Sequence, residues 1–407
     1  ASGSRCGFFY GDRFNVVNDE DHLKTYTSFQ TELSNGRTFK VDYLTSEIDV
    51  NDNFQSPSYP ALSLATPANI IMPGQGGSPF SFPVMFLGRA LGSAFDSPAA
   101  PRYLEAQRLS LGLSGELNNG FDMDINYTYS AEDNKGYQPD TSTSRFLNAI
   151  RGGSGAPGTW NLFDSTSNSQ ELIDYIGTFQ ATFVDVKLHV LDFVMTGMVN
   201  DVEVATGFQW RKEHHDVARN DDSIAGFDAN GNLSEPADLI FLGGGIETTA
   251  SRAAYAVFAE AAKQASEKVE LRGAVRYESL ESDSTLNPKV SIRMQANDNL
   301  VLRGSVSTSF REPSLSQLNQ SSVGLQGIQD FDTSGNPVGQ PSFIRIAQAY
   351  STDLIPEEST NMNLGAIWTP NDQLSVKFDY WSIDYRDVIT IESAQGKVIA
   401  GPQGPDV

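Results

Sequence analysis

The clearest pattern in the chain runs from residue 251 to residue 312, where apolar and polar residues alternate through four consecutive segments. In the second segment Val269, Leu271 and Val275 share one parity, whereas Arg272 takes the other. Successive side chains of a β-strand point to opposite faces, so a period of two indicates a strand with one apolar and one polar face. Because short polar stretches separate the segments, the pattern predicts four neighbouring antiparallel strands.

The same alternation recurs before and after this stretch. Further strands are predicted at residues 23–33, 39–43, 109–113, 121–130, 184–199, 202–214, 358–368 and 374–388. Asn35-Gly36 stands between the first two of these segments, and Asn-Gly readily takes the positive φ angles of a hairpin turn. The chain therefore predicts an all-β fold built from antiparallel hairpins.

Short turns alternate with long connections along the chain. The long connections are predicted at residues 53–101, 133–183, 216–250 and 313–357. In an up-and-down antiparallel sheet alternate connections lie at opposite ends, so every long loop falls on one rim, as in outer-membrane barrels. The strands exceed the length usual in soluble sheets and suit a tilted membrane span of about 9–11 residues. We therefore predict an antiparallel up-and-down transmembrane β-barrel, with about 12–14 strands of a larger barrel.

Composition narrows the class of protein further. Fifty-one Asp and Glu residues against 28 Lys and Arg residues give a formal net charge of −23, which argues against a nucleic-acid partner because phosphates need a basic surface. An acidic chain is compatible with a membrane, because a β-barrel meets lipid through an uncharged band. The only cysteine is Cys6, so the chain has neither an internal disulfide framework nor a cysteine-based zinc site. No apolar run approaches the roughly 18 residues of a transmembrane helix.

Little in the sequence supports catalysis. The histidines are His22, His189, His214 and His215, and none of them stands at metal-ligand spacing on a helix face. Adjacent residues of a strand point to opposite faces, so His214 and His215 cannot chelate one ion through both rings. Neither a Gly-x-Ser-x-Gly elbow nor a Walker loop occurs. We predict no enzymatic activity, no cofactor and no bound metal.

Two kinds of loop segment have some features of ligand sites but favour a plainer interpretation. The glycine runs 74–77, 152–155 and 243–245 are not followed by helical patterns, so they predict flexible loops rather than phosphate cradles. Asp228–Asn232 and Asp332–Asn336 place oxygen atoms at alternate positions, as calcium loops do. Neither segment has the closing glutamate at the right distance, which favours β-turns.

Five motifs resemble barrel strands of TonB-dependent outer-membrane receptors. They are Tyr255–Glu260, Asn287–Val290, Val301–Leu318 with a Phe-Arg-x-Pro-Ser element, Glu357–Gly365 and Phe378–Ile389. They occur in the order that the family has, which makes the set specific although no single motif is. The residues that carry the resemblance are Asn287, Pro288, Lys289, Phe310, Arg311, Pro313, Ser314, Glu358, Ser359, Asn361 and Gly365. Upstream, Phe86–Arg89 and Trp160–Phe163 resemble loops of one subgroup of that family.

The resemblance implies a receptor in the outer membrane of a Gram-negative bacterium that imports a scarce, bulky nutrient. The family carries an N-terminal energy-coupling box and a plug inside a barrel of about 22 strands, so residues 1–407 are expected to be a middle-to-late part of such a barrel. The implied partners are outer-membrane lipid, a nutrient ligand on the long loops and plug, and the TonB energy-coupling complex, which acts through the upstream part. Cys6 is then either one half of a disulfide in a loop that begins upstream or a lone thiol.

Two other functions stay open, namely a passive porin or adhesin barrel and a soluble all-β protein with a site in its loops. The ligand is also open, because no loop motif selects among siderophore, vitamin, glycan and peptide. Charges on the polar faces of the predicted strands would cost up to about 2–4 kcal/mol each against lipid, so we expect them to line the lumen. They are Glu270, Arg272, Arg276, Arg293, Arg303, Lys377 and Asp379. Arg311 and Glu312 are expected to brace the wall at its rim.

Overall fold

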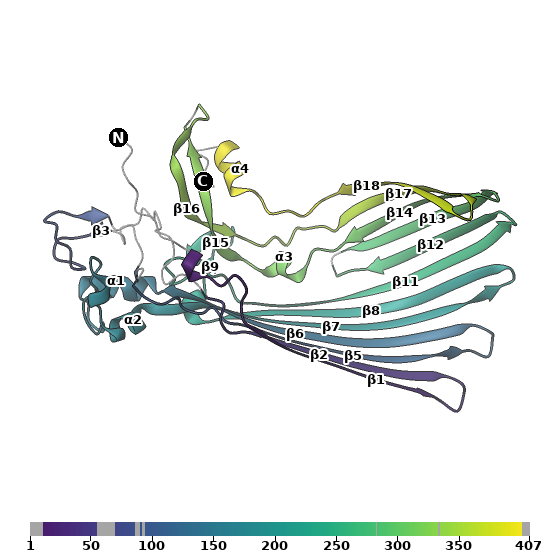
Figure 1. Cartoon of the computed structure of the whole chain (residues 1–407), viewed down its shortest axis with the longest axis horizontal. Coiled ribbons are helices and arrows are strands. Elements are labelled where there is room, and N and C mark those ends of the chain that lie inside the picture. The colour runs from purple at the N-terminus through teal and green to yellow at the C-terminus, as the bar shows by residue number, and fades with distance from the viewer. Residues whose placement is uncertain are drawn as a thin grey trace.

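Twelve long strands form one antiparallel sheet in the computed structural model, and each strand pairs with the next long strand along the chain (Figure 1). This up-and-down order confirms the predicted fold class. The structure describes residues 11–54, 70–85, 90–91, 94–281, 283–332 and 334–400. Cys6 and Phe86–Arg89 lie outside these residues. Within the described part of the chain, no helix is both long and apolar enough to cross a membrane.

The strands of the sheet are long. They are β1 (Glu20–Glu32), β2 (Thr38–Val50), β5 (Arg102–Glu116), β6 (Asp122–Thr141), β7 (Gly177–Val199), β8 (Val202–Arg219), β11 (Thr248–Ser266), β12 (Val269–Ser279), β13 (Ser284–Asn297), β14 (Leu300–Arg311), β17 (Glu357–Asn371) and β18 (Leu374–Arg386). The longest, β7, has 23 residues. At about 3.3 Å per residue it extends for roughly 75 Å, which is well beyond a hydrocarbon core of about 30 Å even for a tilted strand.

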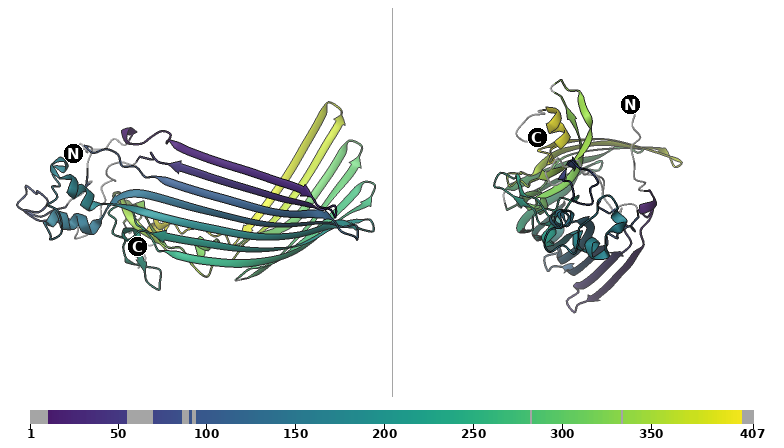
Figure 2. Two further views of the ribbon diagram at one scale, coloured as in Figure 1. Left: turned by 90° about the horizontal axis from the view of Figure 1, so that it is seen from below. Right: turned by 90° about the vertical axis from the view of Figure 1, so that its left-hand side faces the viewer.

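All the long connections gather at one end of the sheet, and the other end has only short turns (Figures 1 and 2). The long connections comprise residues 51–101, 142–176, 220–247 and 312–356. Figure 2 also shows that the sheet is twisted and curved, as expected for part of a barrel wall.

The long connections contain short elements of their own. The strands among them are β3 (Ile70–Ile71), β4 (Val84–Met85), β9 (Gly226–Phe227), β10 (Leu233–Glu235), β15 (Ser322–Phe331) and β16 (Pro337–Gln348). Within the described residues the helices are η1 (Gly11–Arg13), α1 (Thr143–Arg151), η3 (Ser165–Ser167), α2 (Gln170–Ile176), η4 (Asp221–Ser223), α3 (Leu315–Asn319) and α4 (Ala394–Ala400). The strands of the connections pair as β3–β4, β9–β10 and β15–β16, and each pair forms a separate two-stranded sheet.

The predicted loop at residues 133–183 differs from the structure at both ends, and by more residues than the other predicted loops do. Residues 133–183 were expected to be a connection, but β6 continues to Thr141 and β7 begins at Gly177. The upper part of β6 carries polar residues on both faces, as Asp133, Asn134 and Lys135 show. A strand that has water on both sides loses the alternation of apolar and polar residues, so the pattern ends before the strand does.

The register joins apolar residues to apolar residues across the sheet. Leu271 lies opposite Ile292, which lies opposite Gly304, and the row continues through Leu364 to Tyr380. Directly opposed residues of antiparallel strands share a face. This face, which we call the apolar face, also carries Tyr43, Leu111, Tyr127, Leu191, Trp210 and Tyr255 in the first half of the sheet.

The adjacent row belongs to the opposite face. It runs from Glu270 through Arg293, Arg303 and Gly365 to Asp379. Arg272, Arg276 and Lys377 have the same parity on their strands, so all seven charged residues singled out in the sequence lie on one face. We call this the polar face.

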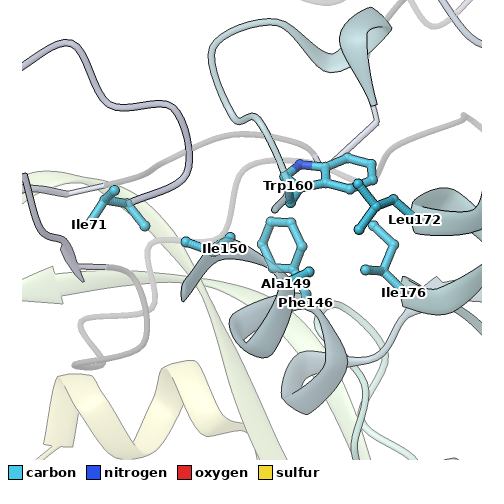
Figure 3. Packing of buried hydrophobic residues seen from close by; sticks show 7 residues of the cluster. All are labelled: Ile71, Phe146, Ala149, Ile150, Trp160, Leu172 and Ile176. Atoms are coloured by element: carbon cyan, nitrogen blue, oxygen red, sulfur yellow. The ribbon is translucent and has the colours of Figure 1, made fainter. Parts of the chain in front are cut away.

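The connection between β6 and β7 has a hydrophobic core of its own (Figure 3). Helices α1 and α2 pack Phe146, Ile150 and Leu172 around Trp160, which is fully buried. Each helix begins at a serine whose side-chain oxygen accepts a backbone N–H of the first turn, an arrangement typical of N-caps. The Trp160–Phe163 motif therefore belongs to a folded unit and not to an open loop.

Candidate functional site at the loop end

Three long connections meet above the ends of β6, β7 and β8, where the buried carboxylate of Asp140 holds one of them. The side chain of Asp140 accepts the backbone N–H of Leu242 at 2.6 Å, that of Phe241 at 3.1 Å, and that of its neighbour Thr141 at 2.7 Å. Burial raises the pKa of the Asp140 carboxyl from 3.8 to about 6, although these N–H donors and the charge of Arg345 act to lower it. Asp140 thus fixes the connection 220–247 to the end of β6.

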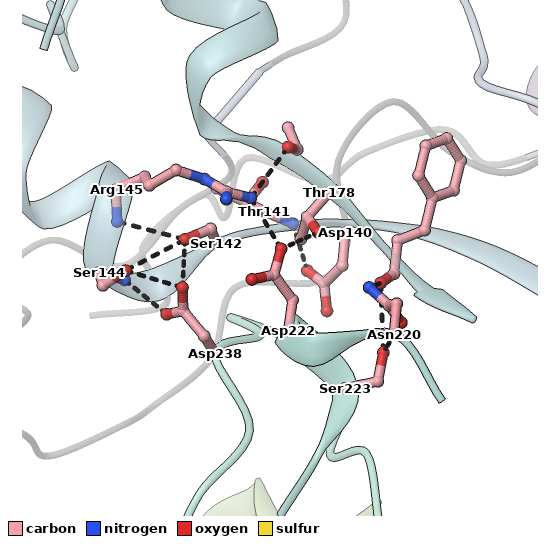
Figure 4. A network of polar contacts seen from close by, with 12 residues as sticks. Asp140, Thr141, Ser142, Ser144, Arg145, Thr178, Asn220, Asp222, Ser223 and Asp238 are labelled. Atoms are coloured by element: carbon pink, nitrogen blue, oxygen red, sulfur yellow. Dashed lines mark hydrogen bonds and ion pairs between the residues drawn. The ribbon is translucent and has the colours of Figure 1, made fainter. Parts of the chain in front are cut away.

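Two further aspartates tie the same connection to helix α1 and strand β7 (Figure 4). The Asp238 carboxylate accepts the Ser142 hydroxyl at 2.5 Å, and the backbone N–H and hydroxyl of Ser144 at 2.7 Å each. Asp222 accepts the Arg145 guanidinium at 2.8 Å and the Thr178 hydroxyl. A carboxylate at the first turn of a helix satisfies otherwise unpaired N–H groups, so Asp238 also stabilises the start of α1.

The glycine run 243–245 is closely packed, so its prediction as a flexible loop is wrong. All three glycines are buried, and Gly244 has a φ of 69°, in the left-handed region. A Cβ atom at Gly243 would collide with the carbonyl oxygen of Val323, and one at Gly244 with that of Ser223. Glycine is needed here because backbone approaches backbone directly.

Two sets of ion pairs fix the start of the connection 312–356, which we call its root. Arg311 donates to both carboxylate oxygens of Glu357 on the next strand, at 2.6 and 2.9 Å. This hydrogen bond lowers the pKa of Glu357 from 4.5 to about 2. The next residue, Glu312, enters a buried ionic network, and Pro313 offers its carbonyl oxygen to Arg252 at 2.5 Å. Ser314 then caps helix α3 together with Gln317 in a reciprocal capping box.

The ionic network lies on the polar face and is internally balanced. Arg252 contacts Glu213 at 2.8 Å and Glu312 at 3.3 Å. Arg211 contacts Glu278, which is only 2% exposed, and lies 3.5 Å from Glu312. Arg276 pairs with the second oxygen of Glu278 at 2.8 Å, so three arginines face three glutamates. Buried charges without such partners would be strongly destabilising, so the network fixes β8, β11, β12 and the root of the connection 312–356 relative to one another.

Several of the motif residues surround a hollow where β13 and β14 separate. Pairing of these strands ends at Lys289 and Ser307, next to Pro288, which has no N–H to donate. The hollow is lined by residues that include Asn287, Ser309, Phe310, Glu358 and Ser359. One side-chain contact bridges β13 and β14 beyond the end of their ladder, since Thr308 donates to Asn287 at 3.3 Å. On the other side of the hollow, the hydroxyl oxygens of Ser309 and Ser359, which are paired across β14 and β17, are 2.7 Å apart. Asn361 donates to Ser309 at 3.1 Å.

Gly365 has no side chain, which allows an ion pair to form directly above it on the sheet. Arg303 on β14 reaches Asp379 on β18 at 2.5 Å, although β17 lies between them. The two side chains meet over Gly365, where a Cβ atom would lie 2.5 Å from both the Arg303 Nε and the Asp379 Oδ1 atoms. A side chain at this position would therefore displace the ion pair.

The geometry offers no metal centre within the described ranges. No group of three or more His, Cys, Asp or Glu residues is arranged there to hold a metal ion. The Asp228–Asn232 and Asp332–Asn336 segments are turns, as predicted, because each aspartate accepts backbone N–H groups of its own turn. His214 pairs with Lys187 and His215 with Val186 in the register, so the two rings point to opposite faces.

A protein-family model described as TonB dependent receptor-like, beta-barrel, matches residues 34–400. The chain belongs to this family of TonB-dependent receptors. The match covers nearly all of the sheet described above, so the resemblance seen in the five sequence motifs is confirmed.

Solved structures of such receptors share the fold. One is a mutant of the ferric enterobactin receptor PfeA from Pseudomonas aeruginosa, with 12% identity and a TM-score of 0.57 over 93% of this chain and 45% of that chain. Another is the siderophore receptor PirA from Acinetobacter baumannii, with 14% identity and a TM-score of 0.54 over 91% and 43%. This chain thus spans a little under half the length of these receptors. No curated protein matches it.

Sequence reasoning identified the receptor's wall motifs but not the residues that organise its loop end. Asp140, Asp222 and Asp238 form contacts with residues 44 to 102 positions away. One local signal was present for α1, since Ser142 precedes it and Gly152 follows it as N-cap and C-cap. The partners of the three aspartates have no signal in the sequence.

Proposed function

We propose that this chain is the barrel portion of an outer-membrane receptor that takes up a scarce, bulky nutrient with energy delivered through TonB. The observation that carries the proposal is the topology, in which every long connection lies at one end of an up-and-down sheet. The folded state of these connections supports it, because a rigid surface binds a ligand at a lower entropic cost than mobile loops do. We assign the chain to the outer membrane of a Gram-negative bacterium.

The proposed orientation follows from the two faces of the sheet. The apolar face meets lipid, and the polar face lines the lumen, because an arginine at the bilayer midplane would cost about 2–4 kcal/mol. The connections 51–101, 142–176, 220–247 and 312–356 then stand outside the cell, where the ligand arrives. TonB acts through a part of the receptor other than this barrel portion.

The ligand belongs to the siderophore, vitamin, glycan or peptide class. Uptake assays with the full-length gene and a deletion strain test this directly. We expect the deletion to abolish accumulation of one labelled nutrient from a panel of these classes. A protonophore should stop its uptake in wild-type cells, because energised import depends on the inner-membrane proton gradient.

Two alternatives predict other results. A passive porin predicts uptake that continues after addition of the protonophore, and an adhesin predicts no loss of uptake in the deletion strain. A soluble all-β protein predicts that the full-length product stays in solution without detergent. Any of these results would contradict the proposed function.

A further inference from the structure

Residues 238–245, which we call the crossing segment, contact elements of three long connections. At its start, Asp238 accepts hydrogen bonds from Ser142 and Ser144 at the beginning of α1. In its middle, the N–H groups of Phe241 and Leu242 donate to Asp140. The crossing segment is therefore attached both to the connection 142–176 and to the end of β6.

The end of the crossing segment contacts the β15–β16 hairpin. Val323 donates its N–H to the carbonyl oxygen of Gly244 at 3.0 Å, and Gly245 forms an antiparallel bridge with Ser322. Arg345 on β16 donates to the carbonyl oxygen of Leu239. The Leu239 side chain is fully buried in a small cluster that includes Val323. The connection 312–356 is thus attached to the same eight-residue stretch.

We propose that the crossing segment couples the connections 142–176, 220–247 and 312–356 into one cooperative unit. Opening the segment would leave the N–H groups of Phe241 and Leu242 without their carboxylate, and the hairpin without its backbone contacts. Such losses are costly in buried surroundings, so the three connections open together and not one at a time. In a receptor that works as proposed above, a ligand bound on one connection then stabilises the other two.

Hydrogen exchange of the full-length receptor in lipid nanodiscs tests the coupling without ligand or TonB. In the Asp238→Ala and Asp140→Ala variants we expect exchange to become roughly tenfold faster in α1 and also in β15, which is distant in sequence. Exchange in β14 should stay unchanged, because the wall does not depend on the crossing segment. The coupling can fail while uptake persists, and uptake can fail while the coupling persists, so the two proposals are tested separately.

Asp228→Ala is the matched control, because it removes a carboxylate from the same connection. The carboxylate of Asp228 accepts only from Asn230 and Asn232 of its own turn, so faster exchange should be confined to that turn. Faster exchange in α1 with no change in β15 would overturn the proposal, as would equal effects of Asp228→Ala and Asp238→Ala. Loss of protection in β14 would show that the Asp140→Ala variant does not fold into the barrel wall. In that case the Asp238→Ala variant decides the outcome, because the half-buried carboxylate of Asp238 lies outside the sheet.

Discussion

Strands β12, β13 and β14 stay in one register over many residues, whereas the connection after β8 reaches β6, α1 and β15 through single side chains and glycine contacts. In the wall each rung repeats the same interaction, so the loss of one side chain leaves the ladder intact. At the loop end Asp140 and Gly244 each make contacts that no neighbouring residue can replace. The two regions of the receptor should therefore respond to different kinds of substitution.

The comparison also concerns the medium around each region. The large apolar side chains of Val290 and Phe378 are each 64% exposed on the apolar face of the sheet, where lipid would cover them in the proposed receptor. Trp160 and Leu239 are fully buried at the loop end, as in a water-soluble domain. On the proposed function the wall depends on the bilayer, whereas the loop end depends on its own packing.

The largest effect is expected from a charge on the apolar face. Leu271→Arg places a guanidinium against lipid at a cost of about 2–4 kcal/mol, so it should impair membrane insertion. Arg272→Leu, one residue further, should leave insertion intact, because Arg272 lies on the polar face, where its exposed side chain pairs with Glu270. Heat-modifiable gel mobility of the full-length receptor measures insertion. Equal effects of the two changes would contradict the assignment of faces.

A smaller effect is expected from a methyl group in the wall. Gly365→Ala would push apart Arg303 and Asp379, whereas a Cβ atom at Gly273 meets nothing within 4 Å. We expect Gly365→Ala to lower the free energy of unfolding by about 1–2 kcal/mol, and Gly273→Ala to have little effect. Urea unfolding in lipid vesicles compares them. If Gly273→Ala is as destabilising as Gly365→Ala, displacement of the ion pair does not explain the effect at Gly365.

At the loop end we expect a dependence on pH that the wall lacks. The pKa of the Asp140 carboxyl is about 6 in the folded receptor, above its ordinary value of 3.8, so folding favours the protonated form. The loop end should then become more stable by about 1 kcal/mol as the pH falls from 7 to 5. Hydrogen exchange of the 241–242 region, corrected for the intrinsic rate, measures this. Asp140→Asn should remove the dependence, and a loss of stability between pH 7 and 5 would contradict it.

The smallest effect in the same range of pH is expected at the root of the connection 312–356. The pKa of Glu357 is lowered to about 2 by Arg311, from an ordinary value of 4.5. The stability that the Arg311 contact contributes is therefore complete above pH 4.5 and is lost only as the pH falls through 2. Urea midpoints at pH 7 and pH 5 should differ by the same amount in the wild type and in Glu357→Gln. If the difference between the midpoints at pH 7 and pH 5 is not the same in Glu357→Gln as in the wild type, Glu357 titrates within this range and the account of the contact is wrong.

The wall was predictable because its two faces differ in polarity on every rung. Val269, Leu271 and Val275 must share a face, and the alternation that results is local and can be read from the sequence. The alternation ends in β6 at Asp133, Asn134 and Lys135, which are polar on both faces, so the prediction for residues 133–183 failed there. Asn287 and Gly365 were recognised only as motif residues, because their roles at a strand separation and beneath an ion pair depend on neighbouring strands.

The loop end was not predictable for a physical reason. The contacts of Asp140 with Phe241 and Leu242 join segments about a hundred residues apart through backbone N–H groups, which every residue has. The glycine run 243–245 was predicted to be a flexible loop because glycine is typical of flexible loops. Glycine is also the residue needed where two backbones pack closely, and the sequence does not distinguish the two cases. One hairpin had a local signal, since the Asp332–Asn336 turn was recognised without the strands β15 and β16 that flank it.

The most direct test of this account is the accessibility of nitroxide labels in the full-length receptor reconstituted in lipid bilayers. Labels are placed singly at Val290 on the apolar face, Ser291 on the polar face and Ala229, an exposed turn residue, at the loop end. We predict that residue 290 is accessible to oxygen and shielded from a water-soluble nickel chelate, and that residue 229 has the opposite profile. Residue 291 should show low accessibility to oxygen. A label at residue 290 that is as accessible to the chelate as one at residue 229 would contradict a lipid-facing wall beneath a folded loop end.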